Sequence, residues 1–542
     1  MKLEKKRKIG SLLLLMAVLM LLSGCRTQQE YKEQADEETY TILDQKWQPK
    51  HGVKVNYRIS DVAPDPNSII LDPNWVPSGQ ITLEEAVAIA TVRSRDYQAR
   101  KESLYNTTLD LTLQRHNFVA QWFGTIDGGY GRDESDETVR AGGDLGFDQL
   151  LADGTQISAA VATDWLRYLT GDPDTSLVSV LSASVSKPLL RGSIKEVVQE
   201  NLTQAERNVL YAIRSFSRFR KEFVVSIVND YLRTLQSLDQ VENAQSNYVS
   251  LQAADEEATL KARAGKLSRF EADETKQRML QARDNLAQSQ RRYQQILDAF
   301  KLTLALPVDA NIVLDSLILE EIALMDISEP NFLVSGAVDM ALKTRLDLAT
   351  SYDKVDDAQR KVAVTEDALR ARLDLVASAR VDSTEETDWA RLRFHDGIYD
   401  VGMVLDLPLD KLSERNSYRR SLISYLQTKR DYALAVDEVK LDVRNAYRGL
   451  IETAQRHHIQ KMGLELAQER VNNTTLLLQA GRVEARVMLD SQDDLLAAQN
   501  DTTTTLVNYM LAKLGFYRDV GILTVKPDGS WQSLEKIDEK LF

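Results

Sequence analysis

One stretch of the chain constrains its fold more than any other. Between Gly192 and Gly265 lie 72 residues that contain neither glycine nor proline. As one continuous helix they would extend about 108 Å at ~1.5 Å per residue. Beyond Gly265, Met279, Ala282 and Leu286 recur at spacings of three and four, which is the narrow apolar stripe of a coiled coil or helical bundle. The sequence therefore predicts long helices that need partner helices alongside them.

An internal repeat organises the rest of the chain. Three motifs recur in the same order: Ala86-Val87-x-x-Ala90 as Ala337-Val338-x-x-Ala341, Pro188-Leu189 as Pro408-Leu409, and Ala264-Gly265-Lys266-Leu267 as Ala480-Gly481-Arg482-Val483. Each half thus reads as helix, strands, a Pro-Leu step, long helix, turn and helix. Because the repeating unit is much longer than a solenoid repeat, the pattern indicates a duplicated module.

The strands alternate between apolar and mostly polar residues. Tyr399, Val401 and Met403 alternate with Asp400 and Gly402. Similar segments are centred near residues 124, 181 and 377, and repeat one adds a hairpin at about Ala141–Trp165 that turns at Asp153-Gly154. Alternation over about ten residues is typical of a membrane barrel with a lipid face and a wet lumen. Half-buried strands of a soluble antiparallel sheet give the same alternation, so both interpretations stay open at this point.

The first 24 residues differ from the rest of the chain. A basic segment is followed by an apolar core, Leu12–Leu22, and then by Ser23-Gly24-Cys25. This pattern predicts a secretory signal, residues 1–24, ending in a bacterial lipobox. Cys25 is the only cysteine, so we expect a covalent lipid on Cys25 and no disulfide. The residue after Cys25 is Arg26. An aspartate at this position often retains lipoproteins at the inner membrane, so its absence favours the outer membrane.

The composition argues against several classes of protein. A net charge of −14 does not suit a nucleic-acid binder or electrostatic docking on anionic lipid. No phosphate-binding glycine loop or nucleophile elbow is found. His457 and His458 lack a further ligand at i+4 that would complete a metal-binding pair. Most carboxylates are expected to lie on solvated helix faces. We therefore expect neither an enzyme, nor a metal site, nor any cofactor beyond the lipid.

Four segments resemble a known family. Ile81–Ala90 looks like the opening helix of the TolC-like outer-membrane efflux proteins, and Pro188–Gly192 looks like their strand-to-helix junction. Ala264–Glu271 and Ala480–Val483 look like their periplasmic helix tips. The resemblance covers residues 81 to about 522. It implies a mainly α-helical fold with a membrane β-barrel, in which three chains each give four strands to one barrel and their helices form a tunnel.

The predicted organisation combines the repeat with the resemblance. The expected segments are signal 1–24, lipidated tether and proline-rich linker 25–80, repeat one 81–333 with strands 118–188 and helical hairpin 193–305, repeat two 334–522 with strands 372–408 and helical hairpin 411–515, and tail 523–542. The extra hairpin at 141–165 departs from the simplest family pattern. It puts the number of strands per chain in question.

The resemblance also implies functional residues. Counting from the tip glycines, Asp490 and Glu271 fall where family acids form a ring that narrows the tunnel mouth, while Val487 replaces a second acid; the alternative for Asp490 is an ordinary surface charge. The tips Gly265, Lys266, Leu267 and Gly481, Arg482, Val483 are the expected docking sites. The implied partners are two further copies of the chain, a periplasmic adaptor and an inner-membrane pump.

Two functions follow as hypotheses. The first is a passive export duct of a tripartite efflux pump or a type I secretion system, opened by docking of the adaptor. The second is a lipid-tethered coiled-coil scaffold or adaptor that spans the periplasm without a pore. A scaffold needs no lipid-facing stripe such as Tyr399, Val401 and Met403, so the strands discriminate between the two. We do not expect the sequence to identify the exported substrate, because a wide, water-filled tunnel has few ways to distinguish one solute from another.

Overall fold

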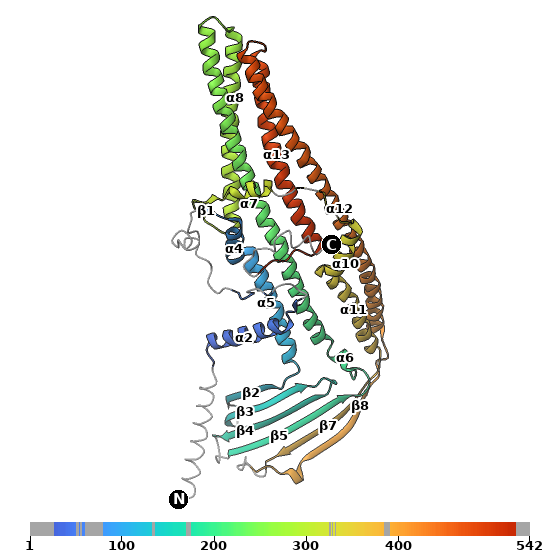
Figure 1. The fold of residues 1–542 in the computed structure, drawn as a ribbon. Helices are drawn as coiled ribbons and strands as arrows, with labels where there is room; N and C mark the ends of the chain where they lie inside the picture. Colours follow the sequence, from blue (N-terminus) through green and yellow to red (C-terminus); the bar gives the residue numbers. More distant parts are fainter. Residues whose placement is uncertain are drawn as a thin grey trace. The chain divides into compact units, whose positions relative to one another are not determined.

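The computed structural model describes residues 26–49, 54, 57–59, 80–132, 136–169, 175–324, 327, 329–330, 332–383 and 391–526. The predicted signal segment, Cys25, most of the proline-rich linker and residues 527–542 of the predicted tail lie outside these residues. The described part is mainly helical, with one large antiparallel sheet (Figure 1). No helix among the described residues is both long enough and apolar enough to cross a membrane.

The elements follow one another in the order that the repeat predicts. The helices are α2 Gln28–Lys46, α4 Leu83–Arg93, α5 Arg95–His116, α6 Lys195–Val198, α7 Glu200–Arg263, α8 Arg269–Thr303, α9 Leu317–Leu324, α10 Val334–Thr344, α11 Leu346–Asp367, α12 Leu412–Gln479 and α13 Ala485–Val520. The strands are β1 Gln80–Ile81, β2 Gln121–Arg132, β3 Glu137–Leu150, β4 Gln156–Tyr168, β5 Thr175–Pro188, β6 Val313–Leu314, β7 Arg372–Asp382 and β8 Ile398–Asp406.

The two halves carry helices of matching length. The pair α4 and α5 has 11 and 22 residues, as does the pair α10 and α11. The long helices α7 and α12 have 64 and 68 residues, and the returning helices α8 and α13 have 35 and 36. A capping box in which Thr82 and Glu85 bond each other's backbone N–H starts α4. The sequence stretch without glycine or proline thus forms α6 and α7.

The chain divides into two compact units, and each unit draws on both predicted repeats. The described residues of the first unit fall within Met1–Gln48, Leu104–Ala212 and Lys354–Thr428, and those of the second within Pro49–Ser103, Ile213–Asp353 and Lys429–Phe542. The first unit holds the large sheet. The second unit holds both helical tips and the small parallel pair β1–β6.

The large sheet has six strands in the order β2-β3-β4-β5-β7-β8, all antiparallel. The hairpin β3–β4 lies between β2 and β5 in the same sheet. It turns at 151–155, where Gly154 has a φ of +82° and an added Cβ would lie 2.4 Å from the carbonyl oxygen of Gly192. The four strands per chain that the family resemblance implied are therefore wrong for this chain, because the additional hairpin extends the sheet instead of lying outside it.

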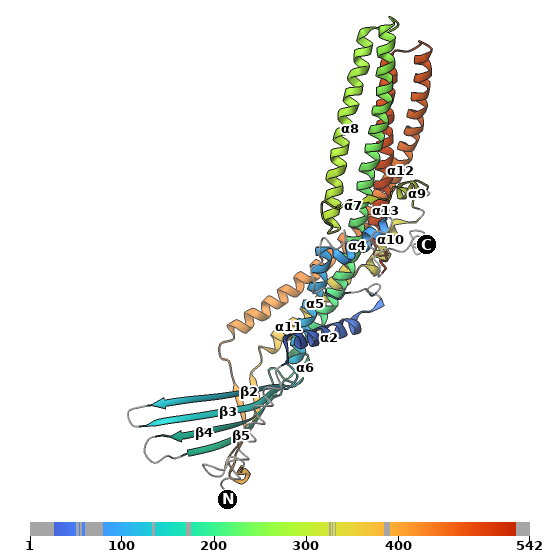
Figure 2. The same cartoon turned by 90° about the vertical axis from the view of Figure 1, so that its left-hand side faces the viewer.

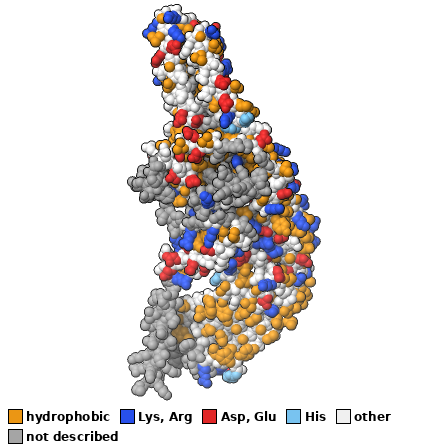
Figure 3. Space-filling view, in the orientation of Figure 1, with side chains coloured by type: hydrophobic (Ala, Val, Ile, Leu, Met, Phe, Trp, Pro, Cys, Tyr) orange, Lys and Arg blue, Asp and Glu red, His pale blue; other side chains and the backbone are white. Residues whose placement is uncertain are grey.

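The register gives the sheet two different faces. Trp122, Phe147, Ala159, Ala183, Ala379 and Tyr399 stand in one row across all six strands. Paired residues share a face, so this row belongs to one apolar face, whose larger members include Trp122, Ile126, Leu145, Phe147, Val161, Leu181, Val185, Tyr399, Val401, Met403 and Leu405. The opposite face carries mainly polar side chains: Thr125, Asp127, Asp144, Ser158, Asp164, Ser182, Ser184, Ser378, Arg380 and Asp400. Hydrophobic side chains gather over the sheet in Figure 3.

The four long helices of the second unit pack side by side toward the tips (Figures 1 and 2). Leu251 of α7, Ala282 of α8, and Met488 and Leu489 of α13 form a buried cluster, against which Leu478 of α12 packs. One apolar contact point thus joins all four helices. The narrow stripe read from the sequence of α8 passes through this cluster at Ala282.

Candidate functional site: the two helical tips

The two tips have the same backbone. Gly265 and Gly481 have φ values of +70° and +67°. At the first tip the N–H of Lys266 donates to the carbonyl of Lys261 at 2.9 Å, and at the second the N–H of Arg482 donates to the carbonyl of Leu477 at 2.9 Å. This six-to-one bond is the Schellman ending of a helix. The repeated Ala-Gly-basic-apolar sequence therefore encodes the same helix stop twice, with glycine at the position that requires positive φ.

The helices that leave the tips begin differently. At the first tip, Ser268 caps α8: its hydroxyl accepts from the N–H of Glu271 at 3.2 Å, and the Glu271 carboxylate accepts from the N–H of Ser268 at 3.1 Å. At the second tip, Glu484 holds the capping position of α13 without a side-chain cap bond. Glu271, predicted as a pore-lining acid, thus serves as the cap partner of its own helix.

The apolar and the basic tip residues differ in exposure. Leu267 and Val483 are both half-buried, whereas Lys266 and Arg482 are exposed. Phe270, in the first turn of α8, is 77% exposed. Phe270 lies within the tip motif Ala264–Glu271, but the motif alone predicts no role for it. Its signal in the sequence is an aromatic residue between Arg269 and Glu271, in a turn where no apolar stripe requires one.

Asp490 forms an ion pair between the two hairpins. Its Oδ1 lies 2.9 Å from Nη2 of Arg278 on α8, and Nη1 of the same guanidinium lies 2.6 Å from Oδ2 of Asp493. The Asp490 side chain remains 44% exposed. Next to it, Arg470 of α12 pairs with Asp494 at 2.5 Å. Three aspartates of α13 thus share two arginines from the helices on either side.

The electrostatics of this cluster are not fully balanced. Burial raises the pKa of Asp493 above its ordinary value; Arg278 acts in the opposite direction, and the charges of Asp490 and Asp494 raise it further. The cluster therefore holds carboxylates close enough to disfavour one another's charge. Loss of Arg278 would leave Asp490 and Asp493 without the guanidinium that they share.

The two predicted pore acids have different partners in the structure. Within the described residues, Glu271 is bonded to Ser268 and Asp490 to Arg278, and no hydrogen bond or ion pair joins the two acids. The described residues also hold no cluster of three or more histidine, cysteine, aspartate or glutamate side chains that could bind a metal ion. His457 is buried and contacts Thr505, with its Nδ1 3.3 Å from the hydroxyl oxygen.

Comparison with known proteins shows a similarity to a family over part of the chain. Residues 337–514 match the family described as outer membrane efflux protein. The pyoverdine export outer membrane protein OpmQ of Pseudomonas aeruginosa is 25% identical over 233 residues, which are 42% of this chain and 47% of that protein. The match thus spans about half the length of this curated relative.

Solved structures agree in fold. The CmeC outer membrane channel of Campylobacter jejuni superposes with a TM-score of 0.61 at 11% identity, covering 91% of this chain and 95% of that one. The outer membrane protein VceC of Vibrio cholerae gives a TM-score of 0.60 at 12% identity, covering 81% and 96%. The matched segment begins at the α10 motif that repeats the opening of α4 and ends in α13. Residues 337–514 are therefore similar to the outer membrane efflux protein family, and the chain has the fold of the CmeC and VceC structures.

Proposed function

We propose that the protein is an outer-membrane channel, assembled from three copies of the chain, that passively conducts solutes out of the periplasm. The observation that carries this proposal is the six-stranded sheet. One of its faces is apolar and exposed, the other is polar, and β2 and β8 form its two edges. A face of this kind suits lipid, and a polar face suits a water-filled lumen.

The edges argue for assembly. All nine residues of β8 are exposed, and so are eleven of the twelve of β2. A long exposed edge strand invites pairing with another chain, and a membrane leaves no alternative to pairing because unbonded backbone groups are costly there. β2 and β8 are the first and last strands of an alternating antiparallel order, so β8 of one copy can pair antiparallel with β2 of the next. Three copies then close a ring without an edge.

Cross-linking tests this closure. The double variant Thr125→Cys/Asp400→Cys places one thiol on each edge strand, and Cys25 is the only native cysteine. Treated with a short bismaleimide in membranes, it should give covalent trimers. The matched control Thr125→Cys/Ser378→Cys moves the second thiol to the inner strand β7 and should give none, as should the wild-type chain. Equal cross-linking of the control, or no product from the edge pair, would refute the shared ring.

We propose that the tips dock a periplasmic adaptor of an inner-membrane pump. Phe270 supplies an exposed apolar contact, Lys266 and Arg482 supply charge, and Leu267 and Val483 support the turns. A buried aromatic anchor is the usual centre of an interface. The variants Phe270→Asp and Leu267→Asp/Val483→Asp should abolish export while trimers still form. Leu466→Asp, at a 67% exposed leucine of α12 away from the tips, should export normally.

We further propose that Asp490 contributes to a gate at the tunnel mouth. Its bond to Arg278 joins the α8 and α13 helices, so opening the tips requires that such links loosen. Asp490→Lys would reverse the charge at three symmetric positions and repel Arg278. In planar bilayers this variant should lose cation preference and multivalent-cation block. Asp437→Lys, at an exposed acid of α12, is the control; unchanged selectivity of the Asp490 variant would make it an ordinary surface charge.

We propose that lipid on Cys25 anchors the channel in the outer membrane. The support is the lipobox and the lone cysteine. The wild-type chain should incorporate labelled fatty acid and Cys25→Ser should not, while trimers persist in part because one lipid adds only a modest increment of membrane affinity. If the wild-type chain takes up no label, the lipid anchor is refuted, but the proposal of a channel is unaffected.

The alternative of a scaffold without a pore is less consistent with the sheet. A scaffold would leave Trp122, Ile126 and Val401 in water, where they are 71%, 76% and 80% exposed. Contiguous exposed apolar patches of this kind mark membrane or protein contacts. Conductance of the purified trimer in planar bilayers decides between the two functions, since a scaffold gives none.

A further inference from the structure

A cavity in the second unit is lined by an excess of positive charge. It has a volume of about 470 Å³ and lies among α7, the α10–α11 junction and the segment after α13. Among the described residues, the ionisable side chains that line it are cationic: Arg214, Arg220, Lys221, Lys343 and Arg345. None of these described lining residues is acidic. None of the functions proposed above uses this cavity.

Two buried side chains in the lining each carry a donor that has no hydrogen-bond partner among the described residues. Arg214 and Ser217 are 8% and 4% exposed, and they stand one turn apart on α7. Arg214 pairs through Nη1 with Asp353 at 2.6 Å, but no described residue accepts a hydrogen bond from its Nε. The hydroxyl of Ser217 likewise has no partner within the described part of the chain. Buried polar atoms without partners are costly and uncommon in folded proteins, so these donors indicate a group that the cavity is built to receive.

The remaining lining favours the same kind of group. Arg220 is 4% exposed and donates to the carbonyls of Val525 and Lys526. Burial lowers its pKa, because a guanidinium is poorly solvated there. The helix α11 begins at Leu346, a lining residue, and the start of a helix carries partial positive charge that favours anions.

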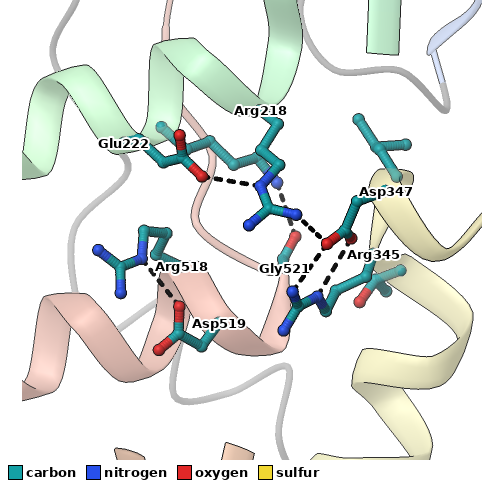
Figure 4. Close-up of a pocket in the computed structure, with 10 residues that line it drawn as sticks. Arg218, Glu222, Arg345, Asp347, Arg518, Asp519 and Gly521 are labelled. Atoms are coloured by element: carbon teal, nitrogen blue, oxygen red, sulfur yellow. Dashed lines mark hydrogen bonds and ion pairs between the residues drawn. The ribbon is translucent and has the colours of Figure 1, made fainter. Parts of the chain in front are cut away.

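A neighbouring pocket shows what a satisfied charge cluster looks like in this unit. There, Arg218 points toward Asp347 and Glu222, and Arg518 points toward Asp519 (Figure 4). Cations and carboxylates interleave, and the dashed contacts pair them. The two pockets share Lys221, Thr344, Arg345, Leu346 and Gly521. The described lining of the larger cavity contributes only cations, although Arg214 pairs with Asp353, and Arg345 with Asp347 and Asp442, outside that lining.

We propose that this cavity binds a small oxyanion such as phosphate. The Ser217 hydroxyl and Arg214 Nε donate to the anion, while Arg220, Lys221 and Lys343 supply the field that attracts it. The site is independent of the channel, of the tips and of the lipid anchor. Bound, the anion links α7 to the start of α11 and stabilises the second unit.

Calorimetric titration of the purified full chain with inorganic phosphate tests the site. Ionic strength is held constant with sodium chloride, so that screening does not change. Ser217→Ala, which removes one hydroxyl from the lining, should weaken phosphate binding about tenfold. Lys343→Gln should weaken it about threefold. Lys354→Gln, at an exposed lysine of α11 outside the lining, should bind as the wild type does.

Thermal unfolding gives a second readout. Phosphate should raise the melting temperature of the wild type and of Lys354→Gln more than that of Ser217→Ala. Equal affinity in all variants, or no binding above the chloride control, would overturn the site. The carboxylates of the chain's own tail could supply the anion instead, because the residues after Lys526 include Asp528, Glu535, Asp538 and Glu539. A variant that ends at Lys526 removes these carboxylates. If the shortened variant binds phosphate and the full chain does not, a free oxyanion is not the ligand of the full chain.

Discussion

The two helical hairpins end in the same turn but begin their return differently. Both turns stop a long helix with a glycine at positive φ and the same six-to-one hydrogen bond. The first hairpin then restarts with a capping box at Ser268, whereas the second restarts at Glu484 without one. The two hairpins thus share the helix stop and not the helix start. The start of α13, which carries Asp490, is therefore the less firmly fixed of the two.

The largest expected effect tests what the tips share. Gly265→Ala and Gly481→Ala should each destabilise their tip by about 1.5 kcal/mol, because alanine resists positive φ. Nothing lies within 4 Å of the added Cβ at either position, so the cost is purely conformational. Hydrogen exchange of the tip amides measures it. Gly463→Ala, in the interior of α12, should have the opposite sign; unequal costs at the two tips would break the equivalence.

The next effect tests how the tips differ. Ser268→Ala should cost about 1 kcal/mol of local stability in the first turn of α8, since it removes a capping bond. Glu484→Ala should have almost no effect on the first turn of α13. Hydrogen exchange of the two first turns, compared in the same sample, measures both. A loss at Glu484→Ala as large as that at Ser268→Ala would show that the starts are equivalent after all.

A gain of smaller size would sharpen the comparison. Glu484→Ser/Val487→Glu gives the second hairpin the spacing of the capping box that Ser268 and Glu271 form in the first. It should stabilise the start of α13 by about 0.5 kcal/mol. The single variant Val487→Glu is the control, because it adds the charge without the cap. Slower exchange in the double variant alone confirms that the missing cap, and not the charge, distinguishes the hairpins.

The smallest effect concerns pH. The first hairpin, 200–303, contains no histidine, whereas the second contains buried His457 and exposed His458. Burial lowers the pKa of His457, as do the charges of Lys461 and His458. The unfolded chain then binds the proton more readily, so the stability of the α12–α13 pair should be full above pH ~6.5 and fall as the pH drops through that value.

Substitutions of the two neighbouring histidines isolate the contribution of His457 to the pH dependence of stability. His457→Gln should flatten the fall of stability between pH 7 and 5, followed by denaturant unfolding at several pH values. His458→Gln changes the adjacent exposed ring and should leave most of the fall in place. A pH profile that neither substitution alters would assign the acid sensitivity to other groups.

The sequence predicts elements well where a single local rule decides them. Absence of glycine and proline marks α7, and the recurring Ala-Gly-basic-apolar motif marks both turns. The alternation at Tyr399, Val401 and Met403 identified the apolar face of β8. These features depend on local backbone preference and on a period of two, both of which can be read from the chain.

The candidate site was less predictable because its properties depend on residues far apart in sequence. Counting from Gly481 located Asp490, but its partner Arg278 lies more than 200 residues away, so the ion pair could not be foreseen. Glu271 was assigned to the pore, while the serine three residues before it was the visible signal of a capping box. Exposure at Phe270 and half-burial at Leu267 follow from packing among helices, which spacing alone does not give.

The inserted hairpin β3–β4 has a consequence for the width of the outlet. Neighbouring strands lie about 4.8 Å apart, and the diameter of a barrel grows roughly linearly with the number of strands. With six strands per copy in place of four, the circumference of the proposed ring grows by half. The number of long helices per copy stays the same. In the proposed ring, the outlet is then wider than one built from four strands per copy, whereas the tips keep the same number of helices.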